Sequence, residues 1–299
     1  MTTRTHEPPP TRAGARRTAR WLTASVALLI TGASAAGIWA SELYTDGVAV
    51  EAVFRGYDLI SLAVVAPVLA LTLLPAFVER PLAQLARVSM LAFCVYNYAY
   101  YLFGAELNAA LLAHIAIFAG SLYGLVLSLM AADVAALAHR FRPGTPVQAV
   151  AVILLLLGGS LAVLQALGLA GFAFTGTVPN EPSRLVVPLS MTRLGAVLDL
   201  SLLVPAYLLA AVWLWRRRAW GYLLGTVVLL AGALHQASYV AGMAFQVAAD
   251  IPGAGFDPFE PFILALFAFG SLLLLANLRR TEPQTPAASP DRTLAGTRT

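Results

Sequence analysis

The chain has 299 residues, of which 59% are hydrophobic and 11% are charged, and its mean hydropathy is +0.77. Soluble domains carry about 25% charged residues, so this composition excludes an ordinary soluble protein. The formal net charge is +4, but the 19 basic residues are all arginines scattered between apolar runs, which indicates no nucleic-acid partner. Because the chain contains no lysine, a Schiff-base cofactor is excluded as well.

Eight apolar runs follow one another along the chain, each near the roughly 20 helical residues that a bilayer core requires. They predict helices over residues 22–40, 59–78, 88–103, 109–130, 147–172, 194–215, 220–245 and 262–278. The predicted fold class is all-α and integral to the membrane, with a transmembrane helical bundle over 21–278. The flanking segments 1–20 and 279–299 are rich in Arg, Pro and Thr, and we predict that both are disordered cytoplasmic tails.

The distribution of arginine predicts the orientation of this bundle. An even number of crossings places both termini on one side of the membrane. If that side is the cytoplasm, every arginine except Arg55, Arg184 and Arg193 lies inside, as the positive-inside rule requires. The start of the chain also has a competing interpretation. Arg16-Arg17 before an apolar run resembles a cleavable secretory signal of the twin-arginine type, which an intact N-terminal mass would exclude.

The two halves of the chain share a spaced pattern. Thirty positions separate Pro67 from Asn97, and thirty also separate Pro205 from His235. The residues that follow correspond as well, with the matched positions Tyr101 and Tyr239, and Gly104 and Gly242. This pattern predicts two parallel four-helix repeats, 21–130 and 147–278, related by an axis along the membrane normal.

Polar side chains at membrane depth usually face the interior of a bundle, so each is a candidate for function. The candidate ligand-binding residues are His235, Asp199, His114, Tyr239, Asn97, Tyr101 and Asp58. Most of them lie within about two turns of the predicted outer surface, whereas His235 lies roughly 15 Å deep. We therefore predict a polar cavity that opens outward, in which His235 exchanges protons near neutral pH. Hydrogen bonding between helices is the other interpretation of the same residues.

Two local contacts are predicted around these candidates. Arg55 stands three residues before Asp58, a spacing at which the two side chains pair on a helix. In the segment YNYAYY, Asn97 and Tyr101 are expected to point inward, while Tyr96 and Tyr100 face lipid or neighbouring helices in part.

No cofactor, metal or catalytic residue is expected. A metal or bis-histidine haem would draw on His114, His235 and Asp199, but no HExxH motif supports it. The two histidines also differ in predicted depth by roughly 7 to 8 Å, which suits one shared iron poorly. The single cysteine, Cys94, lies in an apolar run and is expected to be buried.

Across its membrane portion the chain resembles uncharacterised bacterial multi-pass membrane proteins with YDL and YNYAYY segments, here residues 57–59 and 96–101. The resemblance implies a bacterial inner (plasma) membrane setting and no particular activity. The residues themselves favour the binding or passage of a small solute, ion or proton through the outward-facing cavity, with the lipid bilayer as surroundings. The alternatives are an accessory or structural subunit that contacts a membrane-protein partner, and a membrane-embedded enzyme that modifies lipid.

Overall fold

The computed structural model describes residues 10–40, 42–176 and 185–279, and within these ranges it contains helices and no β-strand. The long helices of the first half are α1 (Pro10–Trp39), α2 (Val48–Ile60), α3 (Ala66–Leu73), α4 (Pro81–Phe103) and α5 (Leu111–Ala131). After the short helix α6 (Val134–Ala138) come α7 (Val147–Thr175), α8 (Leu189–Leu198), α9 (Val204–Trp215), α10 (Ala219–Ala248) and α11 (Phe259–Leu275). The π-helical segments η1 (Ser61–Val65) and η2 (Asp199–Leu203) join α2 to α3 and α8 to α9.

Six helical segments are long and apolar enough to cross a membrane: Arg12–Trp39, Val48–Leu73, Leu111–Ala131, Val147–Thr175, Leu189–Trp215 and Ala219–Ala248. The remaining long helices are α11, which is apolar but has 17 residues, and the more polar α4, which has 23. Large apolar side chains along the helices are exposed, among them Leu28 (74%), Leu156 (59%) and Leu167 (67%). Lipid solvates such side chains, whereas water would not.

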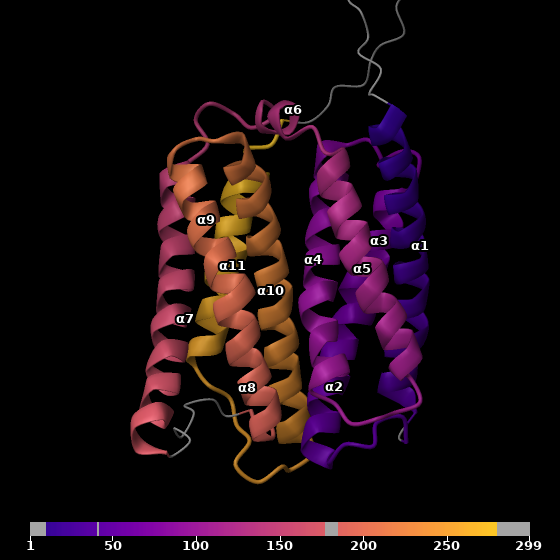
Figure 1. The fold of residues 1–299 in the computed structure, drawn as a ribbon, viewed down its shortest axis with the longest axis vertical. Helices are drawn as coiled ribbons and strands as arrows, with labels where there is room; N and C mark the ends of the chain where they lie inside the picture. The colour runs from indigo at the N-terminus through magenta and orange to yellow at the C-terminus, as the bar shows by residue number, and fades with distance from the viewer. Residues whose placement is uncertain (1–9, 41, 177–184, 280–299) are drawn as a thin grey trace, which may run out of the picture.

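The helices form two groups that lie side by side (Figure 1). Helices α1 to α5 form one group and α7 to α11 the other, and α10 packs against both α2 and α4 where the groups meet. Glycine allows the closest approach in this interface, because a Cβ atom at Gly56 of α2 would overlap the backbone of Gly242 in α10. Small residues at helix crossings permit such close packing inside membranes.

A proline that follows each π-helical segment explains why the helix widens there. Pro67 and Pro205 both follow two residues after the end of a π-helical segment. Proline has no N–H to bond the carbonyl four residues back, and widening the preceding turn accommodates this loss. The spacing to the next long helix is also the same in both halves, from 61 to 81 and from 199 to 219.

Helix α1 begins earlier than its apolar run, and this corrects the predicted tail. Residues 10–20 were predicted to be disordered, but they form the first turns of α1. Long-range contacts that the local sequence does not reveal explain the difference. Arg16 donates hydrogen bonds to the carbonyl of Ala131 in α5, and Arg20 forms an ion pair with Glu79. The rest of both predicted tails, 1–9 and 280–299, lies outside the described residues.

The two ends of the molecule carry different charges. The end at which α1 begins, uppermost in Figure 1, holds the α3–α4, α6–α7 and α9–α10 connections. Its arginines are Arg12, Arg16, Arg17, Arg20, Arg80, Arg87, Arg140, Arg142, Arg216, Arg217, Arg218 and Arg279. The opposite end is acidic, with Glu42, Asp46, Glu51, Glu106, Asp250, Asp257 and Glu260. Among the described residues, Arg55 and Arg193 are the arginines of that acidic end.

Candidate functional site

The first group of buried polar side chains, here called the first acid cluster, consists of Asp58, Tyr44, Tyr101 and His114. Asp58 of α2 has no exposed surface. The hydroxyl of Tyr44 donates to its Oδ2 at 2.6 Å, and the hydroxyl of Tyr101 donates to its Oδ1 at 3.1 Å. Glycine is required at position 37 of α1, because a Cβ atom there would overlap Oδ2 of Asp58. The carboxylate thus lies sealed between α1, α2 and α4.

His114 of α5 completes the first acid cluster. Its ring centroid lies 4.6 Å from that of Tyr101 and 6.4 Å from that of Tyr44, and the side chain is fully buried. Neither ring nitrogen makes a hydrogen bond within the described part of the chain. A buried imidazole with both nitrogens unused retains the capacity to accept or release a proton.

The second acid cluster consists of Asp199, Tyr96, Gln165 and His235. Tyr96 of α4 donates its hydroxyl to Oδ1 of Asp199 at 2.6 Å, and Gln165 of α7 donates Nε2 to Oδ2 at 2.8 Å. The Tyr96 hydroxyl also lies 3.2 Å from that of Tyr100. Asp199 is the first residue of η2, so the widened turn next to Pro205 carries this carboxylate.

His235 of α10 packs on the tyrosines that hold Asp199. Its ring centroid lies 4.6 Å from that of Tyr96 and 6.1 Å from that of Tyr100, with Tyr57 of α2 at 6.2 Å. Atom Nδ1 is buried without a hydrogen bond in the described residues. Tyr96 therefore contacts both Asp199, through its hydroxyl, and His235, through its ring.

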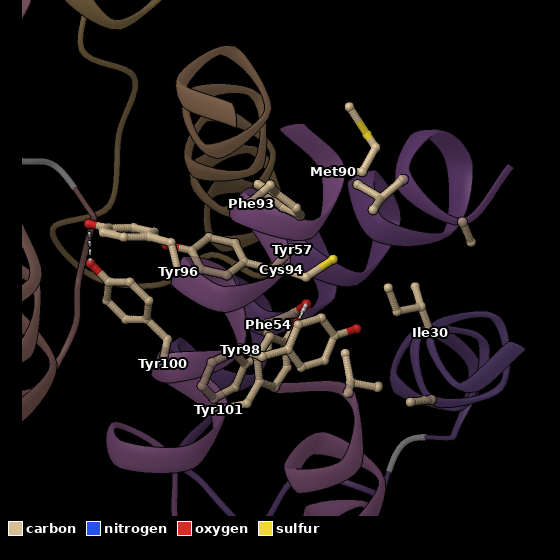
Figure 2. Close-up of a cluster of buried hydrophobic side chains, with 14 of the residues drawn as sticks. Ile30, Phe54, Tyr57, Met90, Phe93, Cys94, Tyr96, Tyr98, Tyr100 and Tyr101 are labelled. Carbon is tan, nitrogen blue, oxygen red and sulfur yellow. Dashed lines mark hydrogen bonds between the residues drawn. The ribbon is translucent and has the colours of Figure 1, made fainter. Parts of the chain in front are cut away.

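Helix α4 separates the two acid clusters and supplies tyrosines to both. Figure 2 shows Tyr96 and Tyr100 directed to one side of this helix, while Tyr98 and Tyr101 point to another. Helical geometry explains the division, because residues four apart share a face and residues five apart do not. The clusters approach each other through Tyr57, which adjoins Asp58 in sequence and contacts the ring of His235.

The structure divides the predicted site residues between these two clusters. Asp58, Tyr101 and His114 belong to the first acid cluster, and Asp199 and His235 belong to the second. Asn97 is fully buried on α4, as expected, and its side-chain amide makes no hydrogen bond within the described ranges. Tyr239 of α10 is partly buried and packs against the core of the first group of helices.

One of the two predicted local contacts is wrong. Arg55 pairs with Glu51 at 2.7 Å and not with Asp58, because Asp58 points into the core toward Tyr44 and Tyr101. Tyr96 and Tyr100, expected to face lipid or neighbouring helices in part, face neighbouring helices, because the second group of helices covers them and leaves them 6% and 8% exposed.

The acid clusters also lie deeper than predicted. Helix α2 begins at Val48 and α8 at Leu189, well before the apolar runs that predicted these spans. At 1.5 Å per residue, Asp58 and Asp199 each lie roughly 15 Å from the start of their helix. Both carboxylates are therefore near the middle of a membrane-spanning segment rather than near its outer end.

Three members of the site were not among the predicted residues. Tyr44 lies in the α1–α2 connection, outside every apolar run, and burial raises the pKa of its phenol well above the usual value. Gln165 and Tyr96 lie within predicted spans. Gln165 lies well inside the apolar α7, whereas the other glutamine of this helix, Gln148, is its second residue, and an amide at such depth is a signal that would have identified Gln165.

No cation balances either carboxylate within the described residues, where the ion pairs are Arg20–Glu79 and Arg55–Glu51. The same residues contain no group of three His, Cys, Asp or Glu side chains close enough to hold a metal ion. The buried acids are thus held by neutral hydroxyl and amide donors, next to imidazole rings.

Together, the six apolar helices and the two buried acid clusters have the pattern of a multi-pass membrane protein with ionisable groups in its core. Comparison with protein-family models, with curated proteins and with solved structures finds no match for this chain.

Proposed function

We propose that this chain is a multi-pass protein of the bacterial inner membrane that takes up protons from the outer face and passes them, with a small solute or ion, through its two acid clusters. The observation that carries this proposal is the pair of buried aspartates, each held by tyrosine and each beside a histidine ring. Chains of acidic and histidine side chains in membranes are typical of proton relays.

The hydrogen bonds support a relay more strongly than a purely structural role. Asp58 and Asp199 accept short hydrogen bonds of 2.6 Å from tyrosine hydroxyls, which are groups that both donate and accept protons. If the polar residues only held helices together, pairs of neutral side chains would suffice. A carboxylate without a balancing cation is a costly group to retain in lipid, and such groups usually have a function.

The topology proposed for this function has eight crossings, with both termini in the cytoplasm. Helices α4 and α11 would cross beside the six longer spans, with α4 covered on one side by α5 of its own group and on another by α10. The arginine-rich end would face the cytoplasm, in agreement with the positive-inside rule. The acidic end and the Tyr44 connection would then face outward, and a proton from that side would reach Asp58 past Tyr44, whose hydroxyl donates to Oδ2 of Asp58.

Two parallel four-helix repeats are part of the same proposal. The equal spacing of the π-helical segments and of the helices that follow them supports a duplication. The halves have since diverged in their polar residues, because Asn97 occupies the position that corresponds to His235. Transporters built from parallel repeats bind their substrates at the interface between the repeats, where Tyr57, Tyr96 and His235 meet here.

Proton flux into proteoliposomes tests the proposal. Vesicles with a trapped pH-sensitive dye and an imposed potassium diffusion potential should acidify several-fold faster with the wild-type protein than without protein. Asp58→Asn and Asp199→Asn should each reduce the rate to that of protein-free vesicles. The matched control is Asp250→Asn, at an exposed loop position with φ 51°, where asparagine is well tolerated. Equal rates for the wild type and the two buried variants would refute proton passage.

A further inference from the structure

A second polar site lies at the opposite end of the molecule from the acid clusters, between α1, α4 and α5. A hollow there is lined by Arg16 and Arg20 of α1, Arg87 and Gln84 of α4, Ser128 of α5, and Glu79. Three arginines against one glutamate leave its lining positively charged. The acid clusters do not use any of these residues.

Arg87 is the most informative residue of this hollow. Its side chain is only 8% exposed, yet Nε and Nη1 make no hydrogen bond within the described part of the chain. A buried guanidinium without a partner is strongly destabilising, because its charge is desolvated and nothing compensates for it. Glu79, the acid that shares the lining of this hollow, is already paired with Arg20.

Further unused donors surround the same hollow. Nε of Arg20 and the hydroxyl of Ser128 are also buried without hydrogen bonds to described residues. Donors from three helices thus converge on one small space and find no acceptor among the described residues. A phosphate group has several oxygen acceptors arranged around one centre, and it is the anion that arginine binds best through paired hydrogen bonds.

The size and position of the hollow restrict the ligand. Its volume is about 40 Å³, enough for a small group but not for an extended organic molecule. A more open hollow of about 390 Å³ on α1 shares Arg16 and Arg20 with it and is bordered by the exposed Trp21. Both lie where apolar helices end in arginines, at the level of lipid headgroups.

We propose that Arg16, Arg20, Arg87 and Ser128 form a binding site for a phosphate group, supplied by the headgroup of an anionic lipid in the leaflet at the arginine-rich end. The phosphate completes the hydrogen bonds of Arg87 and joins α1 to α4 and α5. The glycerol and acyl parts of the lipid lie outside the hollow, along Trp21 and the apolar face of α1. This site is independent of proton passage through the acid clusters.

The test measures lipid binding and thermal unfolding of the delipidated full chain in mild detergent. The probes are phosphatidylglycerol and inorganic phosphate, applied separately. Phosphatidylglycerol should remain bound in native mass spectrometry and raise the unfolding temperature of the wild type. Arg87→Gln and Arg16→Gln should each weaken this binding roughly tenfold, because each removes charge-assisted hydrogen bonds. The control Arg80→Gln removes an exposed arginine that stacks on Phe77 outside the hollow.

Each outcome of this test supports or overturns the proposal. A response to inorganic phosphate alone, with the same dependence on the variants, assigns the site to free phosphate rather than to lipid. Without either probe, Arg87→Gln should be at least as stable as the wild type, because it removes an unpaired buried charge. If Arg87→Gln fails to fold, Arg16→Gln decides, since Arg16 is partly exposed. Equal binding by the wild type and Arg16→Gln, or no response to either probe, overturns the site.

Discussion

Asp58 and Asp199 illustrate how a membrane protein retains an acid in its core when no cation among the described residues pairs with it. Removing a carboxylate from water costs several kcal/mol, and hydrogen bonds to the charged or polar oxygen atoms offset part of this cost. Tyr44 and Tyr101 supply these bonds to Asp58, while Tyr96 and Gln165 supply them to Asp199. All four donors are neutral, so the arrangement can lose or gain a proton without breaking an ion pair.

The hydroxyl of Tyr96 should therefore contribute measurably to stability. Tyr96→Phe removes the donor to Oδ1 of Asp199 while it preserves the ring that packs on His235. We expect the free energy of unfolding in detergent to fall by about 1 to 2 kcal/mol. The control is Tyr123→Phe at a position of α5 that is 63% exposed, where no change is expected. Equal unfolding of the two variants would contradict a role for the Tyr96 hydroxyl in holding Asp199.

The sequence identified those site residues whose polarity contrasts with the apolar residues around them. Asp199, His114 and His235 stand out in apolar runs and Asp58 directly precedes one, and the structure places each of them in a buried polar cluster. Their partners were harder to predict. Arg55 and Asp58 have suitable spacing on α2, but the direction in which each side chain points depends on the neighbouring helices. The spacing of residues along one helix carries no information about those neighbours.

At the scale of elements, prolines and glycines determine where the helices bend and approach. Pro67 and Pro205 each stand just after a π-helical segment, and η2 positions Asp199. Gly56 and Gly242 bring α2 and α10 into backbone contact where the two groups of helices meet. The site therefore depends on a helix crossing as much as on its own polar residues.

A methyl group at this crossing should be costly. Gly56→Ala places a Cβ atom against the backbone of Gly242, which cannot move aside as a flexible side chain would. We expect a loss of about 1 to 3 kcal/mol in the free energy of unfolding, the usual cost of overpacking. Gly32→Ala is the matched control, because Gly32 lies within α1 with no atom near its Cβ position. Wild-type stability of Gly56→Ala would show that α2 and α10 do not pack this closely.

The elements were predictable where hydrophobicity dominates and not where tertiary contacts extend a helix. Each of the eight apolar runs falls mainly within a helix of the structure, although the second run extends past the end of α3 into a turn. The starts of α1, α2, α4 and α8 were missed, because charged residues interrupt the apolar pattern in the N-terminal part of each helix. At the start of α1, Arg16 bonds Ala131 and Arg20 pairs with Glu79. This error placed both aspartates too close to the surface.

For the whole molecule, the separation of arginines and acids between the two ends predicts a definite topology. Buried Cys94 gives a low labelling background, so single cysteines introduced at exposed loop positions report their side of the membrane. In intact spheroplasts, an impermeant maleimide should label Leu107→Cys and Phe256→Cys. It should label Arg142→Cys only after permeabilisation. Labelling of the Arg142 variant in intact cells would contradict cytoplasmic placement of the arginine-rich end.

The most direct measurement of the central claim is infrared difference spectroscopy of the protein in proteoliposomes as the outer pH is changed. A carboxyl that takes up a proton shows a C=O band that shifts in D₂O, so the spectrum reports protonation of a buried acid itself. We predict such bands for the wild type and for Asp250→Asn. Asp58→Asn and Asp199→Asn should each lose one component. A wild-type spectrum identical to that of the variant in which both buried aspartates are replaced would show that neither acid exchanges protons with the outer face.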